Sequence, residues 1–337
     1  QLGNKKPICF WIFEKIKWKL SYYSWQIFKK NKKGNYNDPS VNNELNYLNK
    51  AIEVINDQKI NTVILSVGPF KYSSILIELK KQFPKINFVI DYRDYWEDSL
   101  PGLSNTQKES ELELQKKVVS CVDLIMSPNM EMQNFYASKF NKNSYCLPHC
   151  FDHTDFNYPE IKNSSLTDIS LIYGGAFYSE INENIDVIKK FINELSKKKN
   201  IKADFYVSIK GYEKELMHPA IKRFDFIDSK NYFEKVNASD LAILILPPSR
   251  VNAMSSKFFE LLALRKPILY FGGAGAVSDF LLKHQLGFHV TKQNIVEQVE
   301  FVLKNFTDHK IPNKNYDLNA YTFQYQTKLL IEQLNKL

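Results

Sequence analysis

A short segment with two serines, a lysine and a glutamate, residues 255–260, carries side chains suited to binding a phosphorylated ligand. Ser255 and Ser256 follow a strongly apolar run and open a predicted helix, where free backbone N–H groups and the helix dipole attract anions. Lys257 in the first turn adds a positive charge for a diphosphate, and Glu260 can accept two hydrogen bonds from a ribose diol. The same residues also fit an ordinary helix start, with a serine cap, a capping-box-like glutamate and a solvent-facing lysine. The segment alone leaves both interpretations open.

Glycines and a second lysine follow two other predicted strands of the same half. Gly174 and Gly175 come directly after a strand, where the missing Cβ lets backbone approach a phosphate or a sugar. Lys210 and Gly211 end the next strand, at the carboxyl edge where open α/β sheets bind ligands. The alternative for Gly174-Gly175 is a tight turn without a ligand. Gly272 to Gly275 lacks GxGxxG spacing and is a weak motif by itself.

These residues need a scaffold, and the apolar pattern predicts alternating strands and helices in both halves of the chain. We expect strands over residues 62–67, 87–90, 123–126, 144–147, 169–173, 203–209, 224–227, 241–246 and 267–271. We expect helices over residues 43–56, 73–82, 107–121, 130–140, 185–195, 230–236, 256–264, 277–283, 295–305 and 321–337. Alternation at this spacing predicts parallel sheets with helices on both faces, that is, an α/β fold.

The 337 residues are enough for two domains of ordinary size. The alternation stops over a polar, aperiodic stretch that we interpret as a linker, residues 151–167. We therefore expect a Rossmann-like domain over residues 1–150, a second one over residues 168–315, and a terminal helix over residues 316–337 that can cross back to the first domain.

Two separate motifs connect the halves to a known family. The sequence DYRDYW at residues 91–96 and KFFELLALRKP at residues 257–267 resemble the two motifs of bacterial family 4 glycosyltransferases of the GT-B fold. VGPF at residues 67–70 and LIYGG at residues 171–175 also match loops of that family. The similarity spans roughly residues 60–335, with the motifs in the right order and at the right ends of elements.

The resemblance implies two Rossmann-like domains facing a cleft, and a retaining sugar transfer without a metal or other cofactor. The donor would be a nucleoside-diphosphate sugar, and the acceptor a glycan or lipid-linked molecule of cell-envelope polysaccharide synthesis. By carry-over, Ser255, Ser256 and Lys257 would hold the diphosphate, and Glu260 the ribose. Gly174 and Gly175 would line the cleft beneath the phosphates, with Lys210 at the next strand end.

The resemblance places the catalytic candidates, Arg93 and Asp94, on the acceptor side of the cleft. Asp94 is the candidate for contact with the acceptor hydroxyl. The alternative is that Arg93 and Asp94 form an ion pair that only fixes the loop.

The chain departs from the family pattern at two places. Many members carry a second glutamate eight residues before the first-turn acid, and Asn252 stands there instead. Arg250 can serve the phosphates in its place. Nothing before Thr62 reads as the family's first strand and Gly-rich loop, so we expect the first domain to lack that strand.

Two other functions stay open. A nucleotide-sugar 2-epimerase shares the fold, and His149 and His153 are its candidate interface histidines. A non-catalytic nucleotide-sugar-binding homologue is the other alternative. It is favoured by Asn252, which stands where many family members carry a glutamate.

The net charge of +8 is concentrated at one end of the chain. Residues 1–33 contain nine lysines and a single acid, Glu14, interleaved with aromatic residues. Lysines and aromatics over residues 8–33 suit an anionic membrane surface, and the alternative is a helix that packs on its own domain. No nucleic-acid-binding motif accompanies the patch.

Four cysteines in so long a chain do not make a disulfide framework. This composition predicts a cytoplasmic protein. If residues 8–33 bind lipid, the protein is peripheral on the inner face of the plasma membrane. Cys146, His149, Cys150 and His153 are close in sequence, but this single run lacks the second ligand pair of an ordinary zinc site. We therefore expect an inter-domain loop there and no metal.

Overall fold

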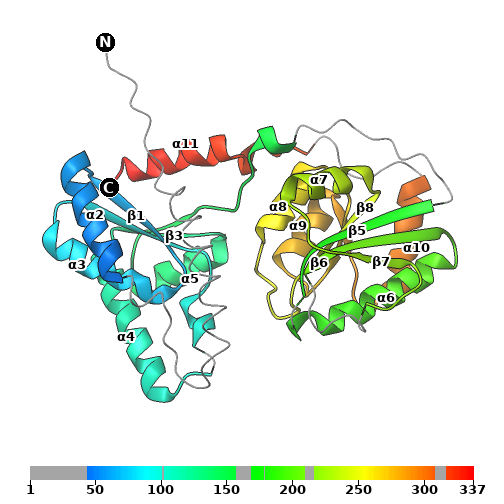
Figure 1. Cartoon of the computed structure of the whole chain (residues 1–337), viewed down its shortest axis with the longest axis horizontal. Helices are drawn as coiled ribbons and strands as arrows, with labels where there is room; N and C mark the ends of the chain where they lie inside the picture. Colours follow the sequence, from blue (N-terminus) through cyan, green and yellow to red (C-terminus); the bar gives the residue numbers. More distant parts are fainter. Residues whose placement is uncertain (1–43, 101, 157–167, 178, 209–215, 308–315) are drawn as a thin grey trace, which may run out of the picture. The chain divides into compact units, whose positions relative to one another are not determined.

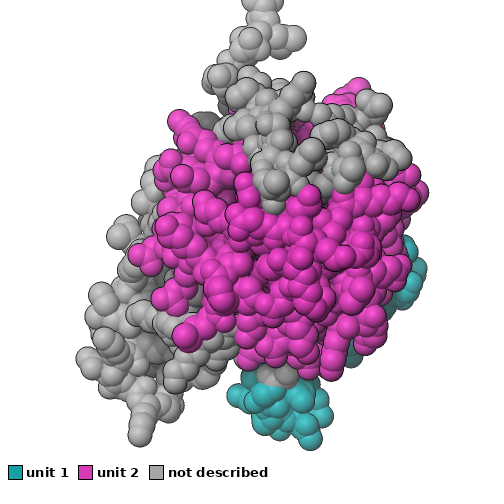
Figure 2. Space-filling view, turned by 90° about the vertical axis from the view of Figure 1, so that its right-hand side faces the viewer, with its two compact units in different colours: residues 1–127, 132–145, 337 teal, residues 128–131, 146–336 magenta. Residues whose placement is uncertain are grey.

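The computed structural model describes residues 44–100, 102–156, 168–177, 179–208, 216–307 and 316–337 (Figure 1). The chain divides into two compact units, coloured separately in Figure 2: residues 1–127, 132–145 and 337 form unit 1, and residues 128–131 and 146–336 form unit 2. Each unit contains a sheet with helices, and every strand pair whose register is defined is parallel. The predicted α/β class is confirmed.

The sheet of unit 1 has the strand order β1-β2-β3-β4. Its strands are β1 (Thr62–Val67), β2 (Asn87–Tyr92), β3 (Leu124–Ser127) and β4 (Ser144–Cys146). Its helices are α2 (Glu44–Gln58), α3 (Ile75–Gln82), α4 (Asn105–Cys121) and α5 (Met130–Phe140), with short 3₁₀ helices at Phe70–Ser74 and Trp96–Ser99. A capping box at Ser104 and Gln107 fixes the start of α4.

The sheet of unit 2 has the order β10-β9-β8-β5-β6-β7. Its strands are β5 (Asp168–Ala176), β6 (Asn200–Ser208), β7 (Ile221–Phe224), β8 (Leu241–Ile245), β9 (Ile268–Phe271) and β10 (Gly287–His289). Its helices are α6 (Asn182–Ser196), α7 (Ser229–Ala238), α8 (Ser256–Ala263), α9 (Ala276–His284), α10 (Ile295–Thr307) and α11 (Phe323–Leu334), and a 3₁₀ helix covers His153–Phe156. The order reverses between β5 and β8, which makes this a doubly wound sheet.

Alternating side chains of the central strands build the core of unit 2 on two faces. On β5, Leu171 belongs to one buried cluster and Ile172 to the other, as the two-residue period of a strand requires. Helices α6 and α10 supply the first cluster, and α7, α8 and α9 the second; Figure 1 shows helices on both faces of this sheet. On α6 the buried residues recur at helical spacing: Ile185, Ile188, Phe191, Ile192 and Leu195.

Predicted elements are present in both units, with boundary shifts and one omission. The edge strand β7 lies three residues before the predicted 224–227 run, because only its two end residues are half-buried and no apolar run marks it. The omission is β10, a three-residue strand that begins with a glycine. Among the described residues, no helix combines the length and the apolar character needed to cross a bilayer.

Candidate functional site

The strongest candidate site lies at the carboxyl ends of β5, β8 and β9, where the strand order of unit 2 reverses. Open parallel sheets bind ligands at such a switch point, because neighbouring connections leave in opposite directions and open a crevice. Strand β5 pairs with β8 only at Leu171 and Ile172, whereas its pairing with β6 continues to Ala176. The last part of β5 therefore borders the crevice, and this part contains Gly174 and Gly175.

Helix α8 begins at the same place because Ser255 caps it. The Ser255 hydroxyl accepts a hydrogen bond from Phe258 N at 3.4 Å, and Ser255 has extended backbone angles. The serine-cap interpretation is therefore confirmed. The capping-box interpretation of Glu260 is wrong, because Phe258 occupies the third helical position where a capping-box glutamate would stand.

Lys257 does not point into solvent. Its side chain is half-buried, its Nζ donates a hydrogen bond to the carbonyl oxygen of Gly174, and the same Nζ lies 5.6 Å from the centroid of the Tyr173 ring. A cation over an aromatic face is attracted by the ring quadrupole. The solvent-facing interpretation is wrong, and Lys257 joins the first turn of α8 to the end of β5.

Lys257 and Glu260 form an electrostatically coupled pair one turn apart. Burial lowers the pKa of Lys257, and the carboxylate of Glu260 partly opposes that shift. Burial raises the pKa of Glu260, and Lys257 partly opposes it. In both groups the loss of hydration outweighs the attraction of the partner. Two half-buried charges held at the expense of stability are typical of a functional site.

The two glycines lie inside the strand, so the tight-turn interpretation is wrong. A Cβ at Gly174 would overlap the ring of Tyr232, and a Cβ at Gly175 would come within 2.7 Å of Tyr173 Oη and 2.8 Å of Lys257 Nζ. Any larger residue here would displace the groups that surround Lys257. The glycines thus make room for the lysine and its neighbours.

Tyr232 on α7 is a member of this cluster that the sequence did not reveal. Its phenol oxygen is buried and has no hydrogen-bond partner of normal geometry among the described residues. Burial raises the pKa of Tyr232, reinforced by Tyr173 and Glu260 and opposed by the nearby backbone of Gly174. Only the position of the aromatic residue on the buried face of a helix could have indicated it.

The glycine run after β9 supports the loop between β8 and α8. Ala276 N donates to Val251 O at 2.8 Å, a Cβ at Gly273 would overlap Pro248 O, and a Cβ at Gly275 would overlap Val251 O. From α6, Asn184 Nδ2 donates to Leu246 O, the first carbonyl after β8, at 3.3 Å and to Phe271 O, the last carbonyl of β9, at 2.8 Å. Close packing of backbone therefore accounts for these glycines.

Two predicted donor residues are not part of this cluster. Arg250 is exposed on the loop between β8 and α8, and Ser256 is exposed at the helix start. Lys210 lies outside the described residues, as do residues 8–33.

In unit 1, the acidic motif shows a different arrangement from the one proposed from sequence. Asp91 lies within β2, is only 5% exposed, and accepts a hydrogen bond from Arg93 Nε at 2.8 Å. Burial raises the pKa of Asp91, and Arg93 and Ser66 oppose the shift. Asp94 is exposed. The structure thus pairs Arg93 with Asp91, a residue of the motif that is not among the predicted site residues.

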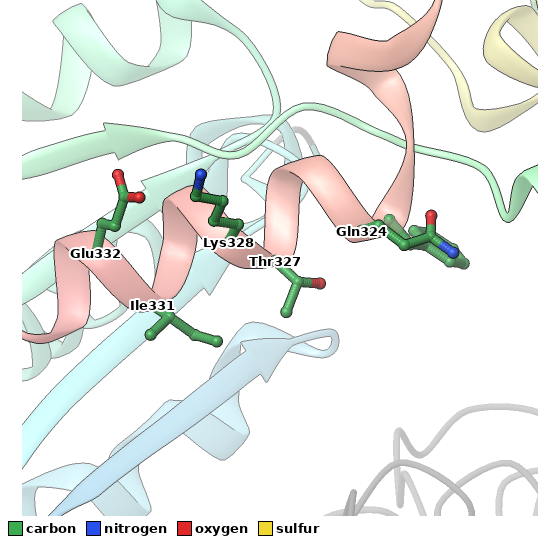
Figure 3. Close-up of a pocket in the computed structure, with 6 residues that line it drawn as sticks. Gln324, Thr327, Lys328, Ile331 and Glu332 are labelled. Carbon is green, nitrogen blue, oxygen red and sulfur yellow. The ribbon is translucent and has the colours of Figure 1, made fainter.

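The remaining candidates do not form a further site. Among the described residues, no group of three or more His, Cys, Asp or Glu side chains is placed to hold a metal ion. A shallow depression lies along the surface of α11. Its lining residues all come from that helix: Phe323, Gln324, Thr327, Lys328, Ile331 and Glu332 (Figure 3). None of the predicted site residues lines it.

Solved structures of other proteins have a similar fold, although the sequence comparisons find no match. No protein-family model matches the chain, and no characterised protein matches it by sequence. A glycosyltransferase from Rickettsia africae has a TM-score of 0.59 at 13% identity, covering 90% of this chain and 83% of its own. The N-terminal domain of a trehalose-6-phosphate phosphatase from Candida albicans has a TM-score of 0.59 at 10% identity, covering 90% and 76%.

A third solved structure, the UDP-GlcNAc 2-epimerase from Methanocaldococcus jannaschii, has a TM-score of 0.53 at 12% identity and covers 91% of this chain and 84% of its own. Structural similarity at sequence identities this low is evidence for the fold alone. The chain has the fold of GT-B proteins, with two Rossmann-like domains in series.

Proposed function

We propose that the protein is a nucleotide-sugar-dependent glycosyltransferase whose unit 2 binds the donor. The observation that carries the proposal is the coupled pair of Lys257 and Glu260 on α8, next to Gly174 and Gly175 at the strand-order reversal. A positive charge at a helix N-terminus suits a diphosphate, and a carboxylate one turn away suits a ribose diol. The sequence resemblance to family 4 glycosyltransferases assigns the same roles to the same positions.

Each donor residue has a separate task in this proposal. Lys257 and the N–H groups of the first turn of α8, including that of Ser256, neutralise the diphosphate. The Ser255 hydroxyl accepts the capping hydrogen bond from Phe258 N. Ser255 therefore contributes to phosphate binding through its backbone. Arg250, on the exposed loop, adds charge to the phosphates. Neutralising a leaving diphosphate in this way is the principal task of such a site.

The proposed reaction transfers the sugar with retention of configuration. The bond between the anomeric carbon and the diphosphate oxygen breaks, a bond forms from that carbon to an acceptor hydroxyl oxygen, and the hydroxyl proton passes to the departing diphosphate. Arg93 and Asp94 of unit 1 would contact the acceptor, a glycan or lipid-linked molecule. We propose no metal, because Lys257 and the helix terminus supply the positive charge. Residues 8–33 would attach the enzyme to an anionic membrane.

Nucleotide binding tests the donor site directly. Titration calorimetry with UDP, GDP and CMP should show binding of one nucleotide by the wild type. Lys257→Ala should weaken that binding about 10- to 100-fold, the effect expected for one charge-assisted hydrogen bond. Lys283→Ala is the matched control, because Lys283 is an exposed lysine on α9 of the same unit. If a folded wild type binds none of these nucleotides or their sugar derivatives, the donor-site assignment is wrong.

A 2-epimerase is the second candidate, and the structural similarity to the Methanocaldococcus enzyme favours it. Such an enzyme inverts the configuration at C2 of the sugar without an acceptor. Incubation with UDP-N-acetylglucosamine, followed by proton NMR, distinguishes the two. Appearance of the C2 epimer would replace the glycosyltransferase proposal, whereas donor consumption that depends on an added acceptor supports it. Tight binding without either reaction would indicate a non-catalytic binding protein.

A further inference from the structure

The end of β5 presents the backbone of Gly174 to the crevice of unit 2. Ser170 O accepts a hydrogen bond from Asp240 N on the β8 side of the strand. Because alternate residues of a strand direct their backbone groups to the same neighbour, Gly174 faces the β8 side as well. Pairing with β8 ends at Ile172, so the Gly174 groups depend on side chains for hydrogen bonds.

Two side chains meet this buried backbone. Lys257 Nζ donates to Gly174 O. The ring of Tyr232 lies so close to Gly174 that a Cβ there would overlap its Cε2 and Cζ atoms, so the hydroxyl-bearing end of the ring is next to the glycine. Tyr232 is 8% exposed, and its hydroxyl has no hydrogen-bond partner of normal geometry among the described residues.

A diphosphate bound at the start of α8 would compete with Gly174 for Lys257. If the ammonium turned toward the phosphates, Gly174 O would lose its donor in a buried place. An unpaired buried carbonyl is costly, and a buried hydroxyl without a partner is costly too. A hydrogen bond between these two groups would remove both penalties at once.

We propose that Tyr232 is a positioning residue of the donor site. Its hydroxyl donates a hydrogen bond to Gly174 O when the ammonium group of Lys257 turns to the diphosphate. This inference rests on the proposed function, because it assumes that Lys257 binds phosphate. It assigns a task to a buried polar group that otherwise has none. Tyr232 itself touches neither the sugar nor the phosphates; it acts by releasing Lys257.

The stability of four proteins tests the exchange without a ligand. In the wild type, Tyr232→Phe should leave the melting temperature nearly unchanged, because the deleted hydroxyl makes no hydrogen bond of normal geometry among the described residues. In a Lys257→Met background Gly174 O is already without its lysine, so Tyr232 should bond to it. There, Tyr232→Phe should lower the melting temperature by about 2 to 4 °C, the effect of one hydrogen bond in a domain of this size. Equal effects in both backgrounds would overturn the proposal.

Ligand affinity provides the second measurement, with inorganic pyrophosphate and the nucleotide among UDP, GDP and CMP that the wild type binds as probes in titration calorimetry. Tyr232→Phe should weaken binding about three- to tenfold, since it makes the release of Lys257 costly. Tyr92→Phe is the control, because Tyr92 is also a buried phenol without a partner among the described residues, but in unit 1. It should leave affinity unchanged.

The outcomes separate this inference from the proposed function. Wild-type affinity retained in Tyr232→Phe would overturn the role of Tyr232 and leave the donor site intact. A folded wild type that binds neither pyrophosphate nor any of UDP, GDP, CMP and their sugar derivatives would overturn both.

Discussion

The carboxyl ends of the two sheets are closed by different kinds of side chains. In unit 1, Phe70 follows β1 and Trp96 follows β2, and their rings stack with centroids 5.2 Å apart. Tyr92 and Tyr136 extend the aromatic cluster at 4.8 Å. In unit 2, the corresponding edge holds a lysine, a glutamate and two tyrosines around a glycine pair.

Strand order explains the difference. Among the described residues, the chain of unit 1 moves in one direction through β1-β2-β3-β4, whereas in unit 2 it reverses between β5 and β8. A reversal of this kind opens a crevice by topology, and polar groups collect there in unit 2. The proposed donor site therefore has support from the fold as well as from its residues, while the acceptor-side candidates have support from their residues alone.

The largest effect should come from adding one methyl group at the end of β5. In Gly174→Ala the new Cβ would overlap the ring of Tyr232, which is buried. We expect about 3 kcal/mol lower stability, at the upper end for overpacking, together with loss of nucleotide binding. Urea denaturation and titration calorimetry measure the two effects.

Gly68→Ala is the matched control for that substitution. Gly68 follows β1 in unit 1, and a Cβ there would meet nothing within 4 Å. Its stability should stay within about 0.5 kcal/mol of the wild type. Equal destabilisation by both substitutions would contradict the view that the end of β5 is closely packed around the site.

The sequence was sufficient for the elements with long apolar or well-capped segments, and insufficient for contacts across the sheet. Strand β8 is fully buried and reads as a continuous apolar run, and the Ser255 cap marks the start of α8. The position of Lys257 against Tyr173 depends on how β5 and α8 meet in space, which no local pattern encodes. The burial of Asp91 does not follow from the sequence pattern, because the predicted strand ends at Ile90, whereas β2 continues to Tyr92.

The next effect concerns the charge pair of unit 1. Arg93→Met should lower the free energy of unfolding by about 2 kcal/mol at pH 7, because it removes the only positive charge paired with the buried carboxylate of Asp91 among the described residues. The loss should shrink toward pH 4, since protonation of Asp91, whose pKa is raised, removes the uncompensated charge. Chemical denaturation at both pH values measures it.

The neighbouring acid provides the contrast. Asp94 is exposed, so Asp94→Asn should change stability by less than about 0.5 kcal/mol. If Asp94 contacts the acceptor, turnover should fall while nucleotide affinity stays unchanged. Unchanged turnover in Asp94→Asn would remove it from the catalytic candidates.

A smaller effect is expected at the cap of α8. Ser255→Ala removes the oxygen that accepts from Phe258 N, which should cost about 1 kcal/mol. Ser255→Gly should cost only a few tenths, because glycine caps helices well. Thermal unfolding of both variants measures the difference, and equal losses would show that the side-chain hydrogen bond contributes nothing.

The smallest effect is a dependence on pH at Glu260, and its sign tests whether burial or the lysine dominates. Burial raises the pKa of Glu260 above its ordinary 4.5 in the folded protein, despite the opposing charge of Lys257. A raised folded-state pKa gives stability that is present in acid and is lost as the pH rises through that pKa. The glutamine of Glu260→Gln cannot titrate, so this variant should gain stability relative to the wild type between pH 4 and pH 7.

The nucleotide affinity of Glu260→Gln should nevertheless fall, because an amide is a weaker acceptor for the ribose hydroxyls. Denaturation curves across this pH range provide the measurement. A variant that instead loses stability relative to the wild type as the pH rises would show that attraction to Lys257 outweighs the cost of burying the carboxylate, and that the charges at the crevice stabilise the fold.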